Sequence, residues 1–88
     1  PVELVNGVAT DRDGISRDTE FHRGSSLILK ELAGEEIECA VLQSRSPSCG
    51  VKQIYDGTFS GHLIPGQGIF ARDLIEQGYK VVDVEDIL

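Results

Sequence analysis

The chain has 88 residues, 40% of them hydrophobic, which fits one small folded domain (residues 1–88) with a modest core. Its 15 acidic and 8 basic residues give a formal net charge of -7. Phosphate groups and anionic lipids attract Lys and Arg, so this balance argues against nucleic-acid and membrane partners. Tryptophan and methionine are absent, so the core must be built mainly from Val, Ile and Leu.

The first part of the chain predicts an extended segment followed by a helix. Residues 1–8 are typical of extended structure, with a turn at residues 6–7, where Asn-Gly is a strong hairpin dipeptide. Residues 19–33 predict a helix, because their apolar side chains recur at helical spacing, and Gly34 is a natural stop. The side chains expected to face inward are Phe21, Ile28, Leu29 and Leu32.

The second part predicts a strand, a glycine-rich segment, a helix and a strand. Residues 37–42 are almost all apolar or small, which favours a strand buried on both faces, as in a parallel sheet. Residues 51–68 are either a functional loop or a short strand pair. Residues 69–77 predict a helix, and residues 79–84 a second buried strand. We therefore expect an α/β fold, with a small, mostly parallel sheet flanked by helices. The inward side chains of the second helix would be Ile69, Phe70, Leu74 and Ile75.

The run Ser46-Pro47-Ser48-Cys49-Gly50 follows the first buried strand, where open α/β sheets place their ligands. Such a loop can present the Cys49 thiolate to a metal cluster or a substrate, because hydroxyls and backbone amides can hydrogen-bond its sulfur. A turn that contains a buried thiol is the simpler interpretation. The Ser46 hydroxyl could relay a proton to a substrate in the same pocket, or it could only stabilise the turn.

Three cations could surround this loop, namely Arg45, Lys52 and Arg72, and would favour a thiolate or attract an anionic group. The run Gly66-Gln67-Gly68 opens the second helix. An ordinary junction between loop and helix is the favoured interpretation, and a helix N-terminus that faces the substrate is the alternative.

The only other cysteine, Cys39, lies in the predicted strand, where a cysteine is usually a small core residue. Two cysteines do not make a disulfide scaffold, and no stretch resembles a signal peptide or a membrane span. These observations favour a reducing cytoplasm. One well-placed thiol cannot assemble a metal site alone.

Several of these motifs together resemble the thiouracil desulfidase family, long catalogued as domain of unknown function 523. The resemblance is carried by the motif at residues 46–50, the Tyr-Asp-Gly-Thr-Phe run at 55–59, the Gly-Gln-Gly run at 66–68 and the Val-rich strand that closes the chain. It covers nearly all of these residues, but only the rear part of the family's sequence.

The resemblance implies a four-iron four-sulfur cluster held by three cysteines, with one open iron that binds the sulfur lifted from a thiolated base. Cys49 matches the third cysteine ligand. Ser46 resembles the serine of the catalytic pocket, with Ser48 as the second choice. The implied substrate is a small thiocarbonyl compound such as thiouracil.

The resemblance also implies that two more cysteines and an acidic residue lie in a front part that these residues lack, so that the α/β fold expected here is an incomplete domain. We therefore expect no cluster on this chain alone, and whether the chain by itself is an enzyme stays open. A fragment is the favoured explanation, with a separate subunit or a remnant as alternatives. The expected partner is the missing N-terminal part or a second copy of the chain. The competing hypotheses are a non-catalytic binding or assembly module and a lone redox-sensing thiol at Cys49.

Overall fold

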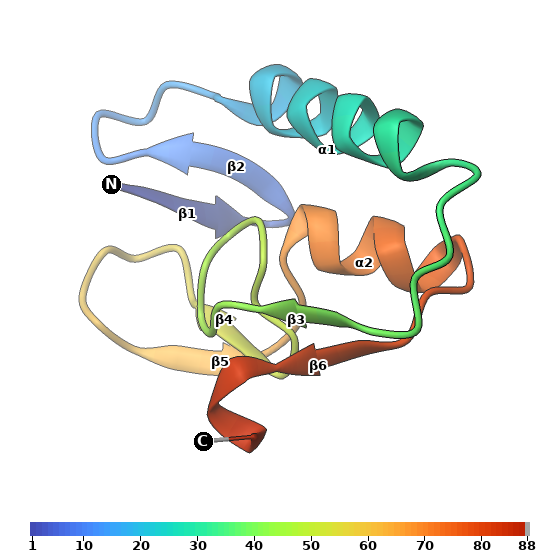
Figure 1. Cartoon of the computed structure of the whole chain (residues 1–88). Helices are drawn as coiled ribbons and strands as arrows, with labels where there is room; N and C mark the ends of the chain where they lie inside the picture. The colour runs from blue at the N-terminus through green and yellow to red at the C-terminus, as the bar shows by residue number, and fades with distance from the viewer. Residues whose placement is uncertain (88) are drawn as a thin grey trace.

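The computed structural model describes residues 1–87, which form six short strands, two helices and a final 3₁₀ turn (Figure 1). In chain order they are β1 (Val2–Val5), β2 (Val8–Asp11), α1 (Asp18–Leu32), β3 (Ala40–Leu42), β4 (Gln53–Tyr55), β5 (Leu63–Pro65), α2 (Ile69–Glu76), β6 (Val81–Asp83) and η1 (Val84–Asp86). Leu88 lies outside the described residues.

The predicted turn at residues 6–7 is confirmed. It joins β1 to β2 in an antiparallel hairpin in which Val5 pairs with Val8. Asn6 has a φ of 50° and Gly7 a φ of 81°. Both residues are thus left-handed, as the two-residue turn that matches the twist of a hairpin requires. The Asn-Gly dipeptide therefore fixes the register of the first strand pair.

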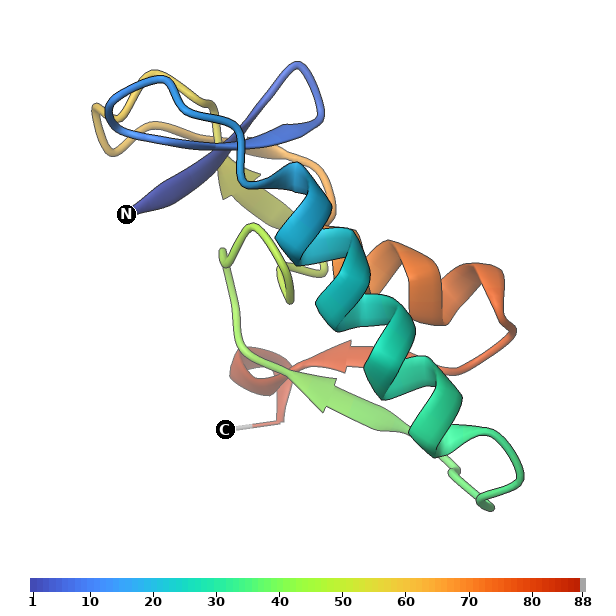
Figure 2. The same ribbon diagram turned by 90° about the horizontal axis from the view of Figure 1, so that it is seen from above.

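The first helix is confirmed, and one predicted inward residue is wrong. Phe21, Leu29 and Leu32 pack against the core, whereas Ile28 is 46% exposed. The inward stripe passes through Ser25, which is 3% exposed, and leaves Ile28 at its edge. Figure 2 shows α1 running diagonally across the molecule, from the end with the β1–β2 hairpin to the end where the chain turns towards β3.

The α/β class is confirmed, and β3 and β6 form the predicted parallel pair. Strand β3 is shorter than the expected residues 37–42 and is buried on one face only. Ala40 and Leu42 belong to the core around α2, whereas Val41 on the other face is 49% exposed. Helices cover only one face of this pair, so the expectation of burial on both faces is wrong for the described residues.

Residues 51–68 contain the short strand pair β4–β5, which confirms one of the two interpretations of this segment. The β structure consists of three two-stranded sheets, of which β1–β2 and β4–β5 are antiparallel. Within each of these two pairs a short turn or loop joins one strand to the next, and such connections favour antiparallel pairing. The β structure is thus less parallel than the sequence suggests.

Helix α2 connects two apolar clusters. Ile69 belongs to the cluster under the β1–β2 hairpin, and Phe70 and Leu74 belong to the cluster under β3 and β6. Ile75 was also expected to face inward but is 41% exposed, because Ala71 takes the inward position beside Leu74. Within residues 1–87, no helix is long and apolar enough to cross a membrane.

Candidate functional site

The loop at residues 46–50, called the motif loop below, lies on the first turn of α2. The Pro47 carbonyl accepts a hydrogen bond from the Ile69 amide at 2.8 Å, and the Ser48 carbonyl accepts one from the Ala71 amide at 3.0 Å. These amides at the start of a helix have no partner within the helix itself. The motif loop therefore supplies the hydrogen-bond acceptors that close the N-terminus of α2.

Gly68 is required by this close contact. A Cβ on Gly68 would lie 2.4 Å from the carbonyl carbon and oxygen of Ser48. Gly50 is similarly enclosed, since its Cβ would lie 2.7 Å from the carbonyl oxygen of Gln53. The Gly-Gln-Gly run is thus a packed junction between loop and helix. The alternative, a helix N-terminus open to the substrate, is wrong for the amides of Ile69 and Ala71, because the motif loop occupies them.

Ser46 stabilises the turn of the motif loop. Its Oγ accepts hydrogen bonds from the backbone amides of Ser48 and Cys49, both at 3.0 Å. These two bonds use the acceptor capacity of the hydroxyl and leave its proton free for donation to another group. Donors directed at the oxygen would also stabilise negative charge on it if the proton were transferred. The geometry therefore suits both a turn residue and a proton donor.

A groove of about 360 Å³, called the Ser46 groove below, lies beside the motif loop. Ser46 and Pro47 line one side, and Glu3 of β1 and Tyr55 of β4 also contribute to the wall. Ser48 does not line it; its carbonyl instead accepts the hydrogen bond from α2. Of the two serines considered from the sequence, the geometry favours Ser46.

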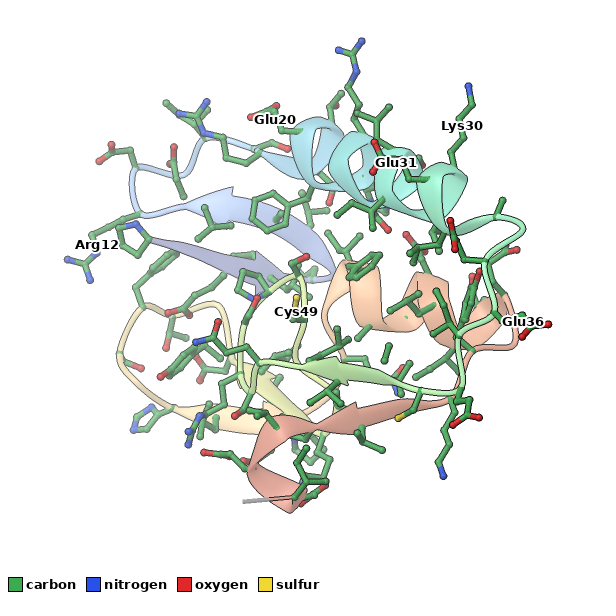
Figure 3. The ribbon with its side chains drawn as sticks, viewed as in Figure 1. Arg12, Glu20, Lys30, Glu31, Glu36 and Cys49 are labelled. Carbon is green, nitrogen blue, oxygen red and sulfur yellow. The ribbon has the colours of Figure 1, made fainter. Side chains whose placement is uncertain are left out.

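Cys49 lies beside the start of α2 (Figure 3). Its side chain is partly buried and packs against the cluster that contains Leu42 and Phe70. This position agrees with the interpretation as a buried thiol and equally with a ligand at the edge of the described domain. The assignment of Cys49 as a cofactor ligand stays a prediction at this point.

The three candidate cations do not converge on Cys49. Arg45 pairs with Glu85 at 2.5 Å and Lys52 with Asp86 at 2.7 Å, so both hold η1 beside the motif loop. The hydrogen bond from Lys52 to Asp86 raises the pKa of that lysine. Their expected role of favouring a thiolate or attracting an anion is therefore not supported, because each charge is already compensated.

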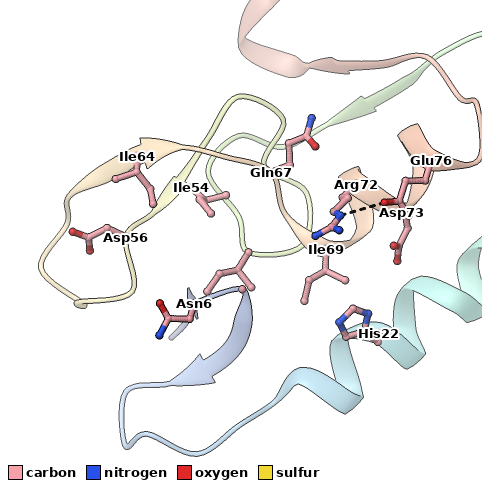
Figure 4. A pocket seen from close by; sticks show the side chains of 12 residues that line it. Asn6, His22, Ile54, Asp56, Ile64, Gln67, Ile69, Arg72, Asp73 and Glu76 are labelled. Carbon is pink, nitrogen blue, oxygen red and sulfur yellow. Dashed lines mark hydrogen bonds and ion pairs between the residues drawn. The ribbon is translucent and has the colours of Figure 1, made fainter.

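The third cation, Arg72, lies on α2 and pairs with Glu76 at 3.3 Å. It lines a larger cavity of about 570 Å³, which shares no lining residue with the Ser46 groove (Figure 4). Leu4 and Ile54 line this cavity, whereas their neighbours Glu3 and Tyr55 line the groove. Successive side chains of a strand point to opposite faces, so the cavity and the groove lie on opposite faces of these strands.

Glu3 has a role that the sequence did not reveal. Its carboxylate accepts hydrogen bonds from the amides of Gly57 at 3.0 Å and Phe59 at 3.1 Å. Gly57 has a φ of 90°, and a Cβ there would lie 2.8 Å from the Leu4 carbonyl oxygen. This contact joins residues more than fifty positions apart, so no local spacing predicts it. Alternation within β1 was the only available signal, because it places Glu3 opposite Leu4.

The donor groups of these residues do not fit a complete iron–sulfur cluster. No group of three or more His, Cys, Asp or Glu side chains that could hold a metal occurs in residues 1–87. Clusters of this kind are usually held by about four cysteine thiolates. Cys49 can supply one ligand, and the remaining ligands would have to come from outside the described residues.

The parallel pair β3–β6 defines an α/β protein in which a cysteine-bearing loop follows the carboxyl end of β3, beside a groove that Ser46 lines. Open α/β sheets often place their ligands at this end of the strands. The comparison with known proteins identifies the family. The chain belongs to the 2-thiouracil desulfurase family, whose profile matches residues 1–86. This finding confirms the resemblance seen in the sequence motifs.

Two relatives are informative. The uncharacterized protein YbbK of Bacillus subtilis (strain 168) is 35% identical over 91 residues, a match that covers 98% of this chain and 60% of that protein. The solved structure of the [4Fe-4S]-dependent thiouracil desulfidase TudS matches with a TM-score of 0.93 and 31% identity, over 99% of this chain and 58% of that one. The chain therefore spans about three fifths of the length of both relatives.

Proposed function

We propose that this chain is the part of a thiouracil desulfidase that supplies one cluster ligand, Cys49, and the serine of the substrate pocket, Ser46. Membership of the family over residues 1–86 and the similarity to TudS support this function. The observation that carries the assignment is the position of the Ser46 hydroxyl, which lines a groove and accepts hydrogen bonds from the amides of Ser48 and Cys49.

A bound cluster with an open iron would supply a Lewis acid for the sulfur of the substrate. The chain's own contribution is to bind the substrate and to donate a proton. A small thiocarbonyl compound in the Ser46 groove would meet the free proton of the hydroxyl. The amides of Ser48 and Cys49 then stabilise the charge that develops on the serine oxygen.

The remaining ligands and the acidic group of the site come, in this proposal, from the portion of the family domain that the chain does not span. The exposed face of the β3–β6 pair supports a covering partner, because parallel strands normally have both faces covered. Val41 is the clearest apolar side chain on that face. We place the protein in the reducing cytoplasm, where two free cysteines stay reduced.

A non-catalytic binding module is the second candidate. It is favoured by the lack of a metal-binding group of side chains within the described residues. The two candidates differ in iron content. We would reconstitute the full-length gene product anaerobically and measure iron, acid-labile sulfide and the conversion of 2-thiouracil to uracil. Cluster with conversion supports the desulfidase, and the absence of both supports the module.

The role of Ser46 needs variants that preserve its two accepted hydrogen bonds. Ser46→Asn keeps an acceptor oxygen for the amides but has no hydroxyl, whereas Ser46→Thr keeps both. We expect Ser46→Asn to retain iron and to lose about a hundredfold or more in rate, as is typical when a general acid is removed. Ser46→Thr should keep most of the activity. Equal rates in the two variants would remove Ser46 from the chemistry.

A further inference from the structure

The Ser46 groove contains an aromatic ring to which no role has been given. Tyr55 ends β4 and lines the groove together with Ser46. A parallel β-bridge between Arg45 and Ile54 holds the two segments side by side, so the residues that follow, Ser46 and Tyr55, are also brought close together. The ring thus lies on the same face as the proposed proton donor, opposite the core residue Ile54.

Strand pairing and the loop that follows both restrain the backbone at Tyr55. It pairs with Leu63 of β5, and the loop that follows it is fixed by the hydrogen bonds from the amides of Gly57 and Phe59 to the Glu3 carboxylate. A restrained backbone reduces the conformational freedom that has to be lost when a ligand binds. The backbone that carries the Tyr55 ring in the wall of the groove is therefore already ordered.

The charges of the groove favour a neutral ligand. Arg45 is the only Lys or Arg among the lining residues, and it is paired with Glu85. The Glu3 carboxylate is engaged by two amides. A phosphate group would find no unpaired Lys or Arg side chain in this wall. A flat, uncharged heterocycle can instead place its ring on Tyr55 and its thiocarbonyl towards Ser46.

We propose that Tyr55 is the binding residue that selects a planar, neutral thiolated heterocycle over a non-cyclic thiocarbonyl compound. This inference rests on the proposed function of the groove, but it concerns binding and not turnover. Contact between an aromatic side chain and a base strengthens binding, as alanine substitutions show. A tenfold change in the dissociation constant, about 1.4 kcal/mol, is therefore the expected scale.

The test measures binding to the iron-free, full-length gene product by ligand-observed NMR titration, with 2-thiouracil and with thioacetamide. Tyr55→Leu keeps an apolar side chain but removes the ring, so 2-thiouracil should bind about tenfold more weakly. Tyr55→Phe should stay within about threefold of the unchanged protein, and the affinity for thioacetamide should be the same in all of them. The matched control is Tyr79→Leu, since Tyr79 is partly buried against the cluster that contains Phe70 and Leu74 and does not line the groove.

An equal affinity for 2-thiouracil in the unchanged protein and Tyr55→Leu would overturn the inference, as would the absence of any binding to the unchanged protein. A parallel loss for thioacetamide would also overturn it, because the variant would then have damaged the groove as a whole. The proposed function fails separately, through the absence of cluster and of desulfuration in the reconstituted protein.

Discussion

Gly68 and Ser48 are in such close backbone contact that no side chain fits between them. A Cβ on Gly68 would lie 2.4 Å from the Ser48 carbonyl, closer than any ordinary van der Waals contact. The Ala71 amide bonds to that same carbonyl. The position of the motif loop, and with it that of Ser46 and Cys49, therefore depends on a glycine about twenty residues further along the chain.

Gly68→Ala should displace the motif loop and lower the free energy of unfolding by about 1–3 kcal/mol, the usual cost of forced overpacking. The matched control is Gly24→Ala on α1, where a Cβ would meet no atom within 4 Å. That change should raise the free energy of unfolding by about 0.5–1 kcal/mol, because alanine is the better helix former. Urea unfolding of both variants measures the difference. Equal stability of the two variants would contradict the close contact.

One partly buried hydrogen bond links the two helices, in addition to their apolar contacts. Ser25 is 3% exposed, and its Oγ donates to Asp73 at 2.6 Å. Ser25→Ala should destabilise the protein by about 1.5–3 kcal/mol, since it removes a bond to a charged group and leaves a partly buried carboxylate without this donor. The neighbouring Ser26 is exposed, so Ser26→Ala should change the stability by less than about 0.5 kcal/mol. Similar losses in both would refute the special role of Ser25.

Glu3 should control the mobility of the loop after Tyr55. Glu3→Ala removes the acceptor for the amides of Gly57 and Phe59, which should then exchange with solvent at least about tenfold faster. The control is Glu20→Ala on the exposed start of α1. Hydrogen exchange followed by NMR reports each amide separately. Unchanged protection of both amides in Glu3→Ala would show that the carboxylate does not hold this loop.

Acid should weaken the turns that two aspartates close. The hydrogen bond from the Ile15 amide lowers the pKa of Asp11 below its usual 3.8, and hydrogen bonds from Thr58 lower the pKa of Asp56 below the same value. Both aspartates have a lower pKa in the folded than in the unfolded protein, so their carboxylates stabilise the fold at any pH above the unfolded pKa. This stabilisation is lost as the pH falls through the folded pKa values. The unfolding free energy should therefore fall below about pH 4.

Asp56→Asn tests this dependence, because the amide oxygen can still accept from Thr58 but carries no charge. The unfolding free energy of this variant should change less between about pH 5 and pH 2 than that of the unchanged protein. An identical acid loss in both proteins would mean that Asp56 does not contribute to it.

Local patterns in the sequence predicted the elements well but not their surroundings. The Asn-Gly turn, both helices and the parallel strands could be recognised because each depends on residues close in sequence. The exposure of Val41, Ile28 and Ile75 could not be predicted, because it depends on which elements cover each face. Hydrophobic periodicity indicates which residues can be inside but not whether a neighbour is present.

The candidate site shows the same division. The motif at residues 46–50 identified the loop, and its glycines indicated a tight structure. The sequence could not show that Arg45 and Lys52 pair with η1, since those contacts join residues more than thirty positions apart. Alternation within β1 placed Glu3 opposite Leu4, but no sequence pattern indicated its hydrogen bonds to Gly57 and Phe59 or the closure of α2 by the motif loop. Long-range contacts of this kind arise from the fold and have no local sequence pattern.

The central claim is that Cys49 is a cluster ligand, and the two cysteines of the chain offer a matched comparison. We would reconstitute Cys49→Ala and Cys39→Ala of the full-length protein anaerobically and measure iron per protein, with the absorbance spectrum as a second readout. The account predicts that Cys49→Ala loses most of its iron, because one thiolate ligand is missing, whereas Cys39→Ala retains it. Full iron retention in Cys49→Ala would contradict the account and leave Cys49 a buried structural thiol.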